Sequence, residues 1–353
     1  METSKLFDAG YLESIAARAL EQENEARTAH RSTQVEAGKI DLNPYPKAAL
    51  FDPFRSNLTV EQNSLFASND YKEGFRVFKP DPNGPTKITV GKVTKRGRSR
   101  GVLTQAHQDV FYRLLRIWEE QKHKLGPEKT WRENGRIVMS AYELVMLLRG
   151  SDNEEHYETV QELLRDLAAI PIVMEQVHTW RGLEERVEFT LLGDVQWREA
   201  NVDKDTKRPK PGGVSEVRIW FSDFVTEGFY HRHVKPLLSK PYFELGRANE
   251  DGKKRGPRAE IARLLYPFLD GQLHDKPEYT VKLDALAERF CLRRYRFKSQ
   301  RREQFVFAVS VLDCKPIQEG RYTLRTTIRQ SQDGQDFMLV ARREAGQLSL
   351  LSA

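Results

Sequence analysis

A run of positively charged side chains occupies positions 293 to 302. The ten residues, Arg-Arg-Tyr-Arg-Phe-Lys-Ser-Gln-Arg-Arg, carry six positive charges and no acidic side chain. Lysine and arginine neutralise phosphate groups, and arginine and glutamine can also grip the edge of a guanine or adenine with two hydrogen bonds. A charge run on its own is typical of a solvated helix face. What this run can bind therefore depends on the elements that position it.

Helices and a hairpin surround the basic run. The periodicity of the apolar residues predicts a strand at 279–281 and helices over 258–269, 283–290 and 294–312. Two alternating strands follow and are joined at Asp333-Gly334, a dipeptide typical of hairpin turns. Helix, basic helix and hairpin in this order indicate a winged helix-turn-helix, which lays its second helix in the major groove of DNA.

The predicted helix over 294–312 has an apolar and a polar side. Its apolar side comprises Phe297, Phe305, Ala308, Val309 and Leu312. The opposite side offers DNA-base contacts from Arg296, Ser299 and Gln300. The candidates for phosphate contacts, which fix register without reading sequence, are Arg293, Arg294, Lys298, Arg301 and Arg302. In the hairpin, alternation places three more DNA-binding candidates on one face, namely Arg321, Arg325 and Arg329.

The preceding part of the chain repeats this order of elements. We expect strands at 87–90 and 136–139, helices at 104–122, 141–148 and 153–169, and a hairpin of 172–180 with 186–196. The helix at 141–148 opens with Ser140 and Glu143, the two positions of a capping box. When the two copies are aligned, Leu144 falls on Leu286. The pattern predicts two tandem winged-helix domains.

Charge distinguishes the two copies. The helix over 153–169 opens among Asp152, Glu154 and Glu155, whose carboxylates would repel DNA. DNA-backbone contacts from this domain are expected instead from a loop before its first helix, with the basic residues Lys95, Arg96, Arg98 and Arg100. We expect the first domain to contribute more to contacts with other proteins and the second to read DNA.

The chain of 353 residues has room for two domains and an arm. Helical spacing near the start and scattered prolines predict an N-terminal helix over 8–28 and a flexible arm, together spanning 1–85. The first winged-helix domain is placed at 86–240, the second at 241–345, and a tail at 346–353. The expected fold class is α+β, mainly helical. The net charge of +6 is modest, but its concentration in a few runs would attract phosphates.

Several kinds of chemistry have no support in the sequence. Cys291 and Cys314 lack the spacing of a zinc site or a disulfide framework, which fits a reducing cytoplasm. The first residues do not resemble a signal peptide, and the apolar runs are too short to cross a membrane. The segment 84–92 departs from the spacing of a phosphate-binding loop. We therefore expect no catalytic residues, no metal, no cofactor and no membrane contact, and a protein that is not an enzyme.

Two short peptides resemble a docking motif. The C-terminal one reads Gln-Leu-Ser-Leu-Leu over 347–351, and the other reads Gln-Asn-Ser-Leu-Phe over 62–66. Both resemble the pentapeptide Gln-Leu-(Ser/Asp)-Leu-Phe by which bacterial replication proteins dock on the sliding clamp. The candidate clamp-binding residues are Gln347, Leu348, Leu350, Leu351, Gln62, Leu65 and Phe66. Which of the two peptides docks is left open.

Tandem winged-helix units, a more basic second copy and these peptides make the chain resemble plasmid replication initiators, the iteron-binding Rep proteins, and among them the TrfA-like class. The resemblance covers about 86–345 in its order of elements. It implies binding of double-stranded DNA at direct repeats of an origin and opening of adjacent A·T-rich DNA, with single-stranded DNA as a further partner. It also implies recruitment of the sliding clamp, host initiator and helicase, a monomer–dimer equilibrium, and a bacterial cytoplasmic location on nucleoid or plasmid.

Two other functions fit parts of the sequence. A transcriptional regulator or copy-control repressor with the same fold would bind an operator without melting DNA or docking on a clamp. A nicking enzyme would need a tyrosine nucleophile beside a metal, and Tyr230 next to His231 and His233 is the candidate for it. The paired histidines of such enzymes flank an apolar residue on a strand, whereas Arg232 separates these two in a stretch, 224–238, that is predicted to be helical.

Overall fold

The computed structural model describes residues 53–57, 59–60, 64–71, 75–78, 85–93, 99–125, 135–198, 216–245, 257–292 and 297–345. The predicted helix over 8–28 and the C-terminal peptide 347–351 lie outside these segments. The chain divides into two compact units: Arg136–Glu162 and Asp194–Trp220 belong to the smaller, and the other described segments form the larger. The units are interleaved along the chain, whereas the domains predicted at 86–240 and 241–345 are consecutive.

The smaller unit combines a sheet with a capped helix. Among its described residues the strands follow the order β6 (Arg136–Ser140), β10 (Glu216–Phe221), β9 (Leu192–Arg198). Helix α5 (Ala141–Arg149) begins where the Ser140 hydroxyl accepts the backbone N–H of Glu143 at 3.1 Å. It ends at Gly150, whose φ of 78° favours glycine. The predicted capping residue and the predicted helix end are therefore confirmed. Helix α6 (Glu154–Ala169) follows, and its residues up to Glu162 belong to this unit.

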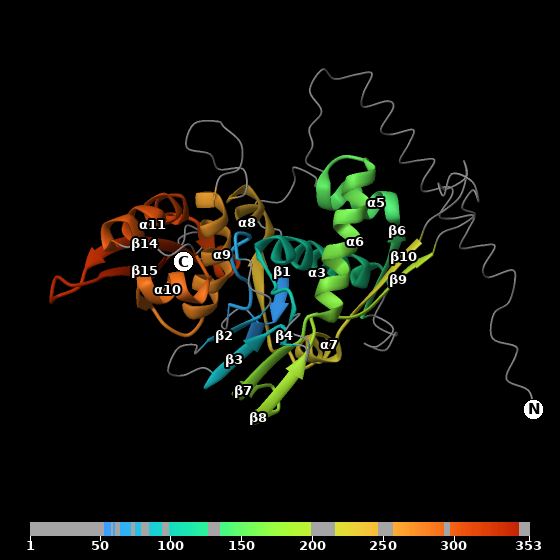
Figure 1. The fold of residues 1–353 in the computed structure, drawn as a ribbon, viewed down its shortest axis with the longest axis horizontal. Coiled ribbons are helices and arrows are strands. Elements are labelled where there is room, and N and C mark those ends of the chain that lie inside the picture. Colours follow the sequence, from blue (N-terminus) through green and yellow to red (C-terminus); the bar gives the residue numbers. More distant parts are fainter. Residues whose placement is uncertain are drawn as a thin grey trace, which may run out of the picture. The chain divides into compact units, whose positions relative to one another are not determined.

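The C-terminal part of the larger unit confirms the predicted order of elements. It comprises α9 (Pro257–Gln272), β12 (Glu278–Lys282), α10 (Leu283–Arg289), α11 (Lys298–Leu312), β13 (Pro316–Ile317), the 3₁₀ turn η1 (Gln318–Gly320), β14 (Tyr322–Gln330) and β15 (Phe337–Ala345). In the part of the chain that is described, these strands form one antiparallel sheet in the order β12-β15-β14-β13. Gly334 takes a φ of 69° in the predicted hairpin turn, and the hairpin of β14 and β15 extends beyond the helices (Figure 1).

Helix α11 packs its apolar side against α9 and β14. The buried residues on that side are Phe305, Ala308, Val309 and Leu312, as predicted. Thr326 of β14 holds the end of the helix, because its hydroxyl donates to the carbonyl of Val309 at 2.8 Å and its N–H to the carboxylate of Asp313 at 3.0 Å. Phe297 departs from the prediction and is 57 % exposed. It lies in extended backbone before Lys298, where the helix begins.

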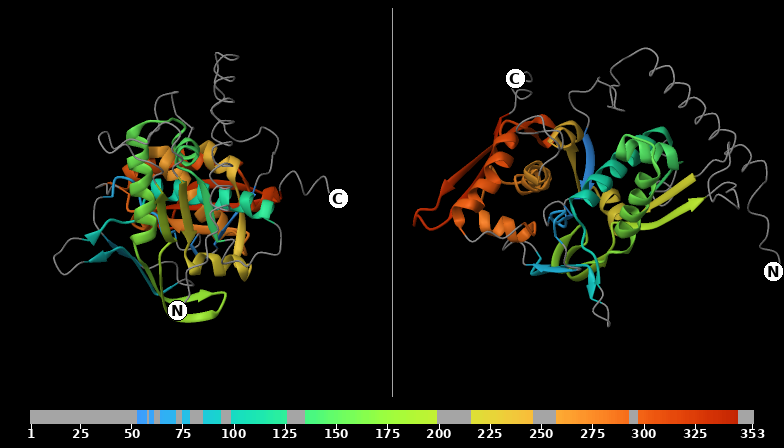
Figure 2. Two further views of the ribbon diagram at one scale, coloured as in Figure 1. Left: turned by 90° about the vertical axis from the view of Figure 1, so that its right-hand side faces the viewer. Right: turned by 45° about the horizontal axis from the view of Figure 1, so that its top comes forward.

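The rest of the larger unit surrounds α3 (Gln105–Leu125). A second sheet follows the order β2 (Arg76–Phe78), β3 (Lys87–Val90), β7 (Ile172–Thr179), β8 (Gly182–Phe189), and a short hairpin pairs β4 (Lys92–Val93) with β5 (Ser99–Arg100). The elements α7 (Asp223–Tyr230), β11 (Val234–Leu238) and α8 (Ser239–Leu245) complete this unit (Figure 2). The helix face of α3 is buried through Phe111, Tyr112 and Trp118.

The first copy of the predicted repeat pairs its strands differently from the second. In the C-terminal copy β12 pairs with the hairpin strand β15. In the first copy β6 pairs with β10, while the hairpin β7–β8 pairs with β3. The hairpin also turns earlier than predicted, at Trp180 and Arg181. The repeat thus holds for the order of elements and not for strand pairing.

The segment predicted as a flexible arm is partly built into the larger unit. Strand β1 (Pro53–Asn57) pairs antiparallel with β11 along its whole length. Leu65, Phe66 and Ala67 are buried, and the N–H of Ala67 donates to the carbonyl of Leu103 at 2.8 Å. The prolines and the lack of a sustained hydrophobic period gave no sign of this packing in the sequence. The few apolar residues of the segment, such as Leu65, Phe66 and Ala67, nonetheless belong to the core.

The stretch 224–238, predicted as helical throughout, changes from helix to strand. Helix α7 covers its first half, and β11 covers Val234–Leu238. Lys235 of β11 is buried and contacts Asp270 of α9, with 2.9 Å between Nζ and Oδ2. Its Nζ also donates to the carbonyl of Pro267 at 3.3 Å. This pair fastens the β1–β11 ribbon to α9.

We predict that removing one partner of this buried pair destabilises the fold more than replacing both partners with apolar residues. Lys235→Met or Asp270→Leu alone should lower the free energy of unfolding by about 3–5 kcal/mol, because each leaves a buried charge without its partner. The double variant should recover most of that loss. Urea denaturation followed by circular dichroism measures all three. A double variant as unstable as the sum of the two single ones would contradict the prediction. Lys240→Ala, which removes an exposed lysine 4.0 Å from Glu244, is the control and should cost less than about 1 kcal/mol.

Candidate nucleic-acid interface

The first half of α11 presents the exposed side chains that the sequence singled out. Because Phe305, Ala308 and Leu312 are buried at helical spacing, the opposite face turns to solvent. The exposed residues of that face are Ser299, Gln300 and Glu303, and Arg302 is exposed at its edge. Among the described residues, Ser299 and Gln300 have no side-chain partner, so both are available to a ligand. Arg293, Arg294 and Arg296, which complete the predicted set on this helix, lie outside the described residues.

Two basic residues of α11 are held by acidic partners. The ammonium of Lys298 lies 2.6 Å from Oδ1 of Asp336 and donates to the carbonyl of Gln335. Nε of Arg301 lies 3.7 Å from Asp284 of α10, and its side chain is only 12 % exposed. Arg301 therefore offers less to a phosphate than its place in the basic run suggests. Arg302 is exposed, with its guanidinium 5.6 Å from the centre of the Phe337 ring.

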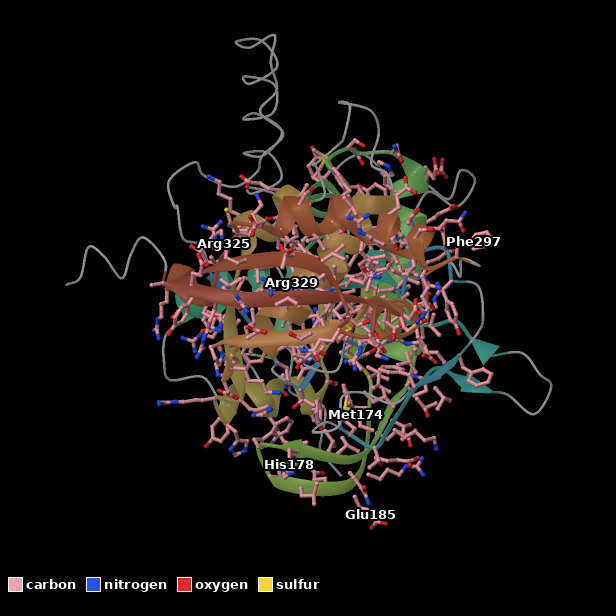
Figure 3. The ribbon with its side chains drawn as sticks, turned by 90° about the vertical axis from the view of Figure 1, so that its left-hand side faces the viewer. Met174, His178, Glu185, Phe297, Arg325 and Arg329 are labelled. Carbon is pink, nitrogen blue, oxygen red and sulfur yellow. The ribbon has the colours of Figure 1, made fainter. Side chains whose placement is uncertain are left out.

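The three predicted arginines of the hairpin differ in their surroundings. Arg325 lies between Glu344, at 2.8 Å, and Asp313, at 3.6 Å, and the hydrogen bond to Glu344 raises its pKa. Arg321 contacts Glu319 at 3.0 Å. Arg329 is exposed and has no ion pair within the described part of the chain. Figure 3 labels Arg325 and Arg329 along the hairpin and Phe297 before α11. Arg329 is thus the hairpin cation that is free to meet a phosphate.

One lysine that contacts this surface was missed by the sequence analysis. Lys282, at the end of β12, places Nζ 2.7 Å from Oδ2 of Asp336. Asp336 is therefore shared between Lys282 and Lys298. These two hydrogen bonds lower the pKa of Asp336 to about 2, and the bond to Asp336 raises the pKa of Lys282. Lys282 stands alone among acidic and apolar neighbours in the sequence, so no charge run signalled it.

The cations predicted to contact DNA from the first copy lie almost entirely outside the described residues. Lys95, Arg96 and Arg98 lie outside them, and only the backbone of Arg100 is described, on β5 opposite Lys92. The exposed opening of α6 is acidic, with Asp152, Glu154, Glu155 and Glu158. This surface would repel a DNA backbone.

The structure argues against the internal clamp peptide. Leu65 is 0 % and Phe66 is 3 % exposed, and the Phe66 ring lies 6.4 Å from those of Phe111 and Tyr112. Docking on a clamp would require both side chains to leave the core, which would cost the free energy of their burial. Gln62, and the C-terminal candidates Gln347, Leu348, Leu350 and Leu351, lie outside the described residues.

The two histidines, His231 and His233, pack against Trp180, and each makes contacts within the fold. His231 stacks on the Trp180 ring at 6.2 Å, and Nε2 of His233 lies 2.9 Å from the hydroxyl of Thr59. Burial lowers the pKa of His233. Within the described residues no group of three or more His, Cys, Asp or Glu side chains is placed to hold a metal ion. The helices of the same residues include none with the length and hydropathy to cross a bilayer.

Comparison with known proteins gives a likeness of fold. No protein-family model matches the chain, and no curated protein matches it. Among solved structures, a selenomethionine crystal structure of domains 2 and 3 of RctB overlays with a TM-score of 0.45 at 11 % identity, covering 82 % of this chain and 99 % of that one. A second structure of RctB domains 2-3 overlays with a TM-score of 0.43 at 10 % identity, covering 80 % and 96 %. A likeness at this level concerns the course of the chain and not its function.

The carboxylate of Asp336, shared by Lys282 and Lys298, should make the stability of the fold depend on pH. Because the pKa of Asp336 is lowered from 3.8 to about 2 in the folded protein, its charged form stabilises the fold above about pH 4. That contribution is lost as the pH falls toward 2. We predict that Asp336→Asn loses less stability than the wild type between pH 4 and pH 2, in urea denaturation at fixed ionic strength. Asp152→Asn, at an exposed position without an ion pair among the described residues, is the control. Equal losses in all three proteins would refute the coupling.

Proposed function

We propose that residues 257–345 form a winged-helix module that binds double-stranded DNA. The support is the arrangement α9, β12, α10, α11, β14, β15, with β12 paired to β15 and α11 packed across α9 and β14. In this fold the second helix of the pair enters the major groove and the hairpin follows the flanking backbone. Helix α11 and the β14–β15 hairpin occupy these two positions.

The observation that carries this proposal is the exposed half of α11. Ser299 and Gln300 lie on the face opposite its buried side and Arg302 is exposed beside them, all in the first half of the helix, which a helix-turn-helix inserts into DNA. Glutamine can pair with adenine through two hydrogen bonds, and arginine neutralises phosphate. The hairpin adds Arg329. Together with the phosphate candidates Arg293 and Arg294, Arg302 and Arg329 give the module four cations for phosphates, which corresponds to a log–log salt slope of about −4.

We further propose that the protein is a plasmid replication initiator that recognises direct repeats at an origin. In this role it would help to open adjacent A·T-rich DNA and recruit host replication proteins. The tandem order of elements and the C-terminal peptide Gln347–Leu351 support this. The burial of Leu65 and Phe66 favours the C-terminal peptide over the internal one as the docking segment. Clamp, host initiator and helicase binding, and a monomer–dimer equilibrium, belong to the same proposal.

A transcriptional regulator or copy-control repressor is the alternative. The C-terminal module would serve either protein equally well, because both need one helix that reads a groove. The difference lies in what DNA it binds and what happens to that DNA. An initiator binds several evenly spaced direct repeats and melts a neighbouring segment, whereas a repressor protects one operator.

Footprinting on the DNA that flanks its own gene, with random DNA as competitor, tests the proposal. We expect several evenly spaced protected repeats, with permanganate-reactive thymines beside them. A single protected palindrome without reactive thymines would instead support the transcriptional regulator and contradict the replication initiator. An absence of protection at every concentration would overturn the DNA-binding function itself.

Two substitutions on α11 separate base reading from phosphate contact. Gln300→Ala should weaken binding to the protected site by roughly 1–3 kcal/mol and leave binding to random DNA nearly unchanged. Arg302→Ala should weaken binding to both DNAs alike, because phosphates are the same in every sequence. Fluorescence anisotropy with the two labelled duplexes measures this. If Gln300→Ala lowers both affinities equally, Gln300 does not read a base.

A further inference from the structure

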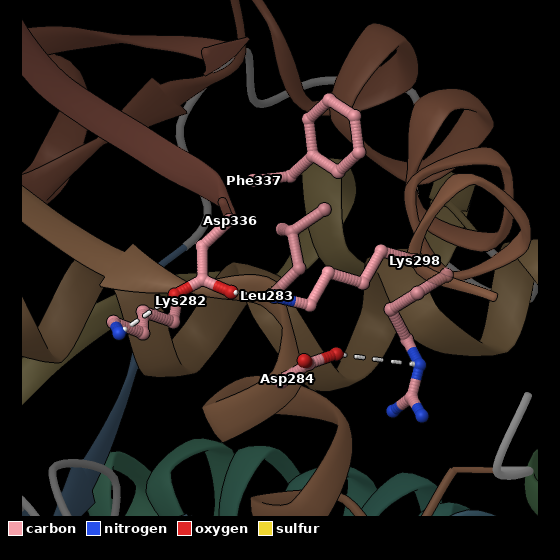
Figure 4. Close-up of a pocket in the computed structure, with 7 residues that line it drawn as sticks. Lys282, Leu283, Asp284, Lys298, Asp336 and Phe337 are labelled. Carbon is pink, nitrogen blue, oxygen red and sulfur yellow. Dashed lines mark hydrogen bonds and ion pairs between the residues drawn. The ribbon is translucent and has the colours of Figure 1, made fainter. Parts of the chain in front are cut away.

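A small pocket lies where three elements of the C-terminal module meet. Lys282 ends β12, Lys298 opens α11, and Asp336 directly precedes β15. The lining residues are Lys282, Leu283, Asp284, Lys298, Arg301, Asp336 and Phe337. Figure 4 shows the carboxylate of Asp336 between the side chains of Lys282 and Lys298. Strand pairing fixes this meeting point, because Lys282 pairs with Met338 in the sheet.

The two lysines keep hydrogen-bond donors for a ligand. An ammonium group has three N–H donors. Lys282 uses one on Asp336, and Lys298 uses two, on Asp336 and on the carbonyl of Gln335. Both side chains remain accessible, with 60 % and 52 % exposure. Three donors on two neighbouring cations are therefore free at the edge of the pocket.

The charges around the pocket favour an anion. Lys282 and Lys298 share one carboxylate, and Arg301 is balanced by Asp284. Asp333 also interacts electrostatically with Lys282, while the Arg302 guanidinium lies over the ring of Phe337, a lining residue of the pocket. With Arg302 counted, the four cations exceed the three carboxylates, so one positive charge is left at the start of α11. Phe297, which precedes this helix, provides no side-chain cap to the first backbone N–H groups. Uncapped N–H groups and the helix dipole add to the attraction for an anion.

We propose that Lys282 and Lys298, held together by Asp336, bind one backbone phosphate of double-stranded DNA at the point where α11 enters the groove. This inference rests on the proposed DNA-binding function and adds Lys282 to its contacts. Lysine at such a position fixes register and carries no sequence information. Because Asp336 stays charged at neutral pH, both ammonium groups are already in place before DNA arrives, which lowers the entropic cost of the contact.

The test is the salt dependence of binding to a random-sequence duplex, measured by fluorescence anisotropy. Lys282→Ala should weaken binding roughly five- to tenfold near 0.1 M salt and make the log–log salt slope shallower by about 0.9, the loss of one phosphate contact. Lys282→Arg should restore most of the slope, since it keeps a cation beside Asp336. Lys240→Ala removes an equally exposed, ion-paired lysine from α8 and should leave affinity and slope unchanged.

The outcomes distinguish this inference from the function on which it rests. If the wild type does not bind the duplex, the proposed function fails. If the wild type binds but Lys282→Ala keeps its affinity and slope, only the phosphate site at Lys282 fails. A titration with inorganic phosphate at constant ionic strength measures whether the pocket binds free phosphate. Phosphate binding that Lys282→Ala abolishes, without a change in DNA binding, would make the pocket a site for free anions and overturn the assignment to DNA.

Discussion

The end of α10, the helix that precedes α11, depends on one buried arginine. Arg76 of β2 donates from one guanidinium nitrogen to the carbonyl of Arg289, at 2.5 Å, and from the other to the carbonyl of Ser64, at 2.8 Å. Its guanidinium lies 4.3 Å from the centre of the Phe78 ring. Burial lowers its pKa, but an arginine remains charged in a protein. A buried charge of this kind is tolerable only when it is paired, so the backbone around it must keep the positions that supply its acceptors.

That requirement joins the N-terminal segment to the C-terminal module. The carbonyl of Arg289 terminates α10, and the next residue, Phe290, accepts a hydrogen bond from the N–H of Ser68 at 2.8 Å. Residues 64–71 and 75–78 therefore hold the C-terminal end of α10 from outside the module. At the far end, the Lys235–Asp270 pair ties β11, and with it β1, to α9. The helix proposed to read DNA thus owes its position to residues more than two hundred positions earlier in the chain as well as to its own core.

The sequence predicted the C-terminal module well because its signals are local. Phe305, Ala308 and Leu312 follow the helical period, and Asp333-Gly334 marks the hairpin. The signals for β1 and β11 are not local. Pro53 and Pro236 are residues that usually interrupt secondary structure, and a lysine such as Lys235 is usually exposed. All three nonetheless lie in the paired strands β1 and β11. The candidate site was predicted in part for the same reason. Arg302 and Gln300 stand in a visible run, whereas Lys282 acquires its role only when strand pairing brings Asp336 beside it.

The acidic partners of the basic residues set the strength of the proposed interface. Asp336, Asp284 and Glu344 each contact a cation of α11 or of the hairpin, so these cations are fixed in place but partly neutralised. Fixed cations lose little side-chain entropy when a phosphate binds, and the neighbouring carboxylates limit the attraction to DNA of any sequence. Such a surface gives modest affinity for random DNA and leaves discrimination to the base contacts of α11. For the DNA binding proposed for this module, such a balance would favour specific sites over an excess of other DNA more than a higher charge would.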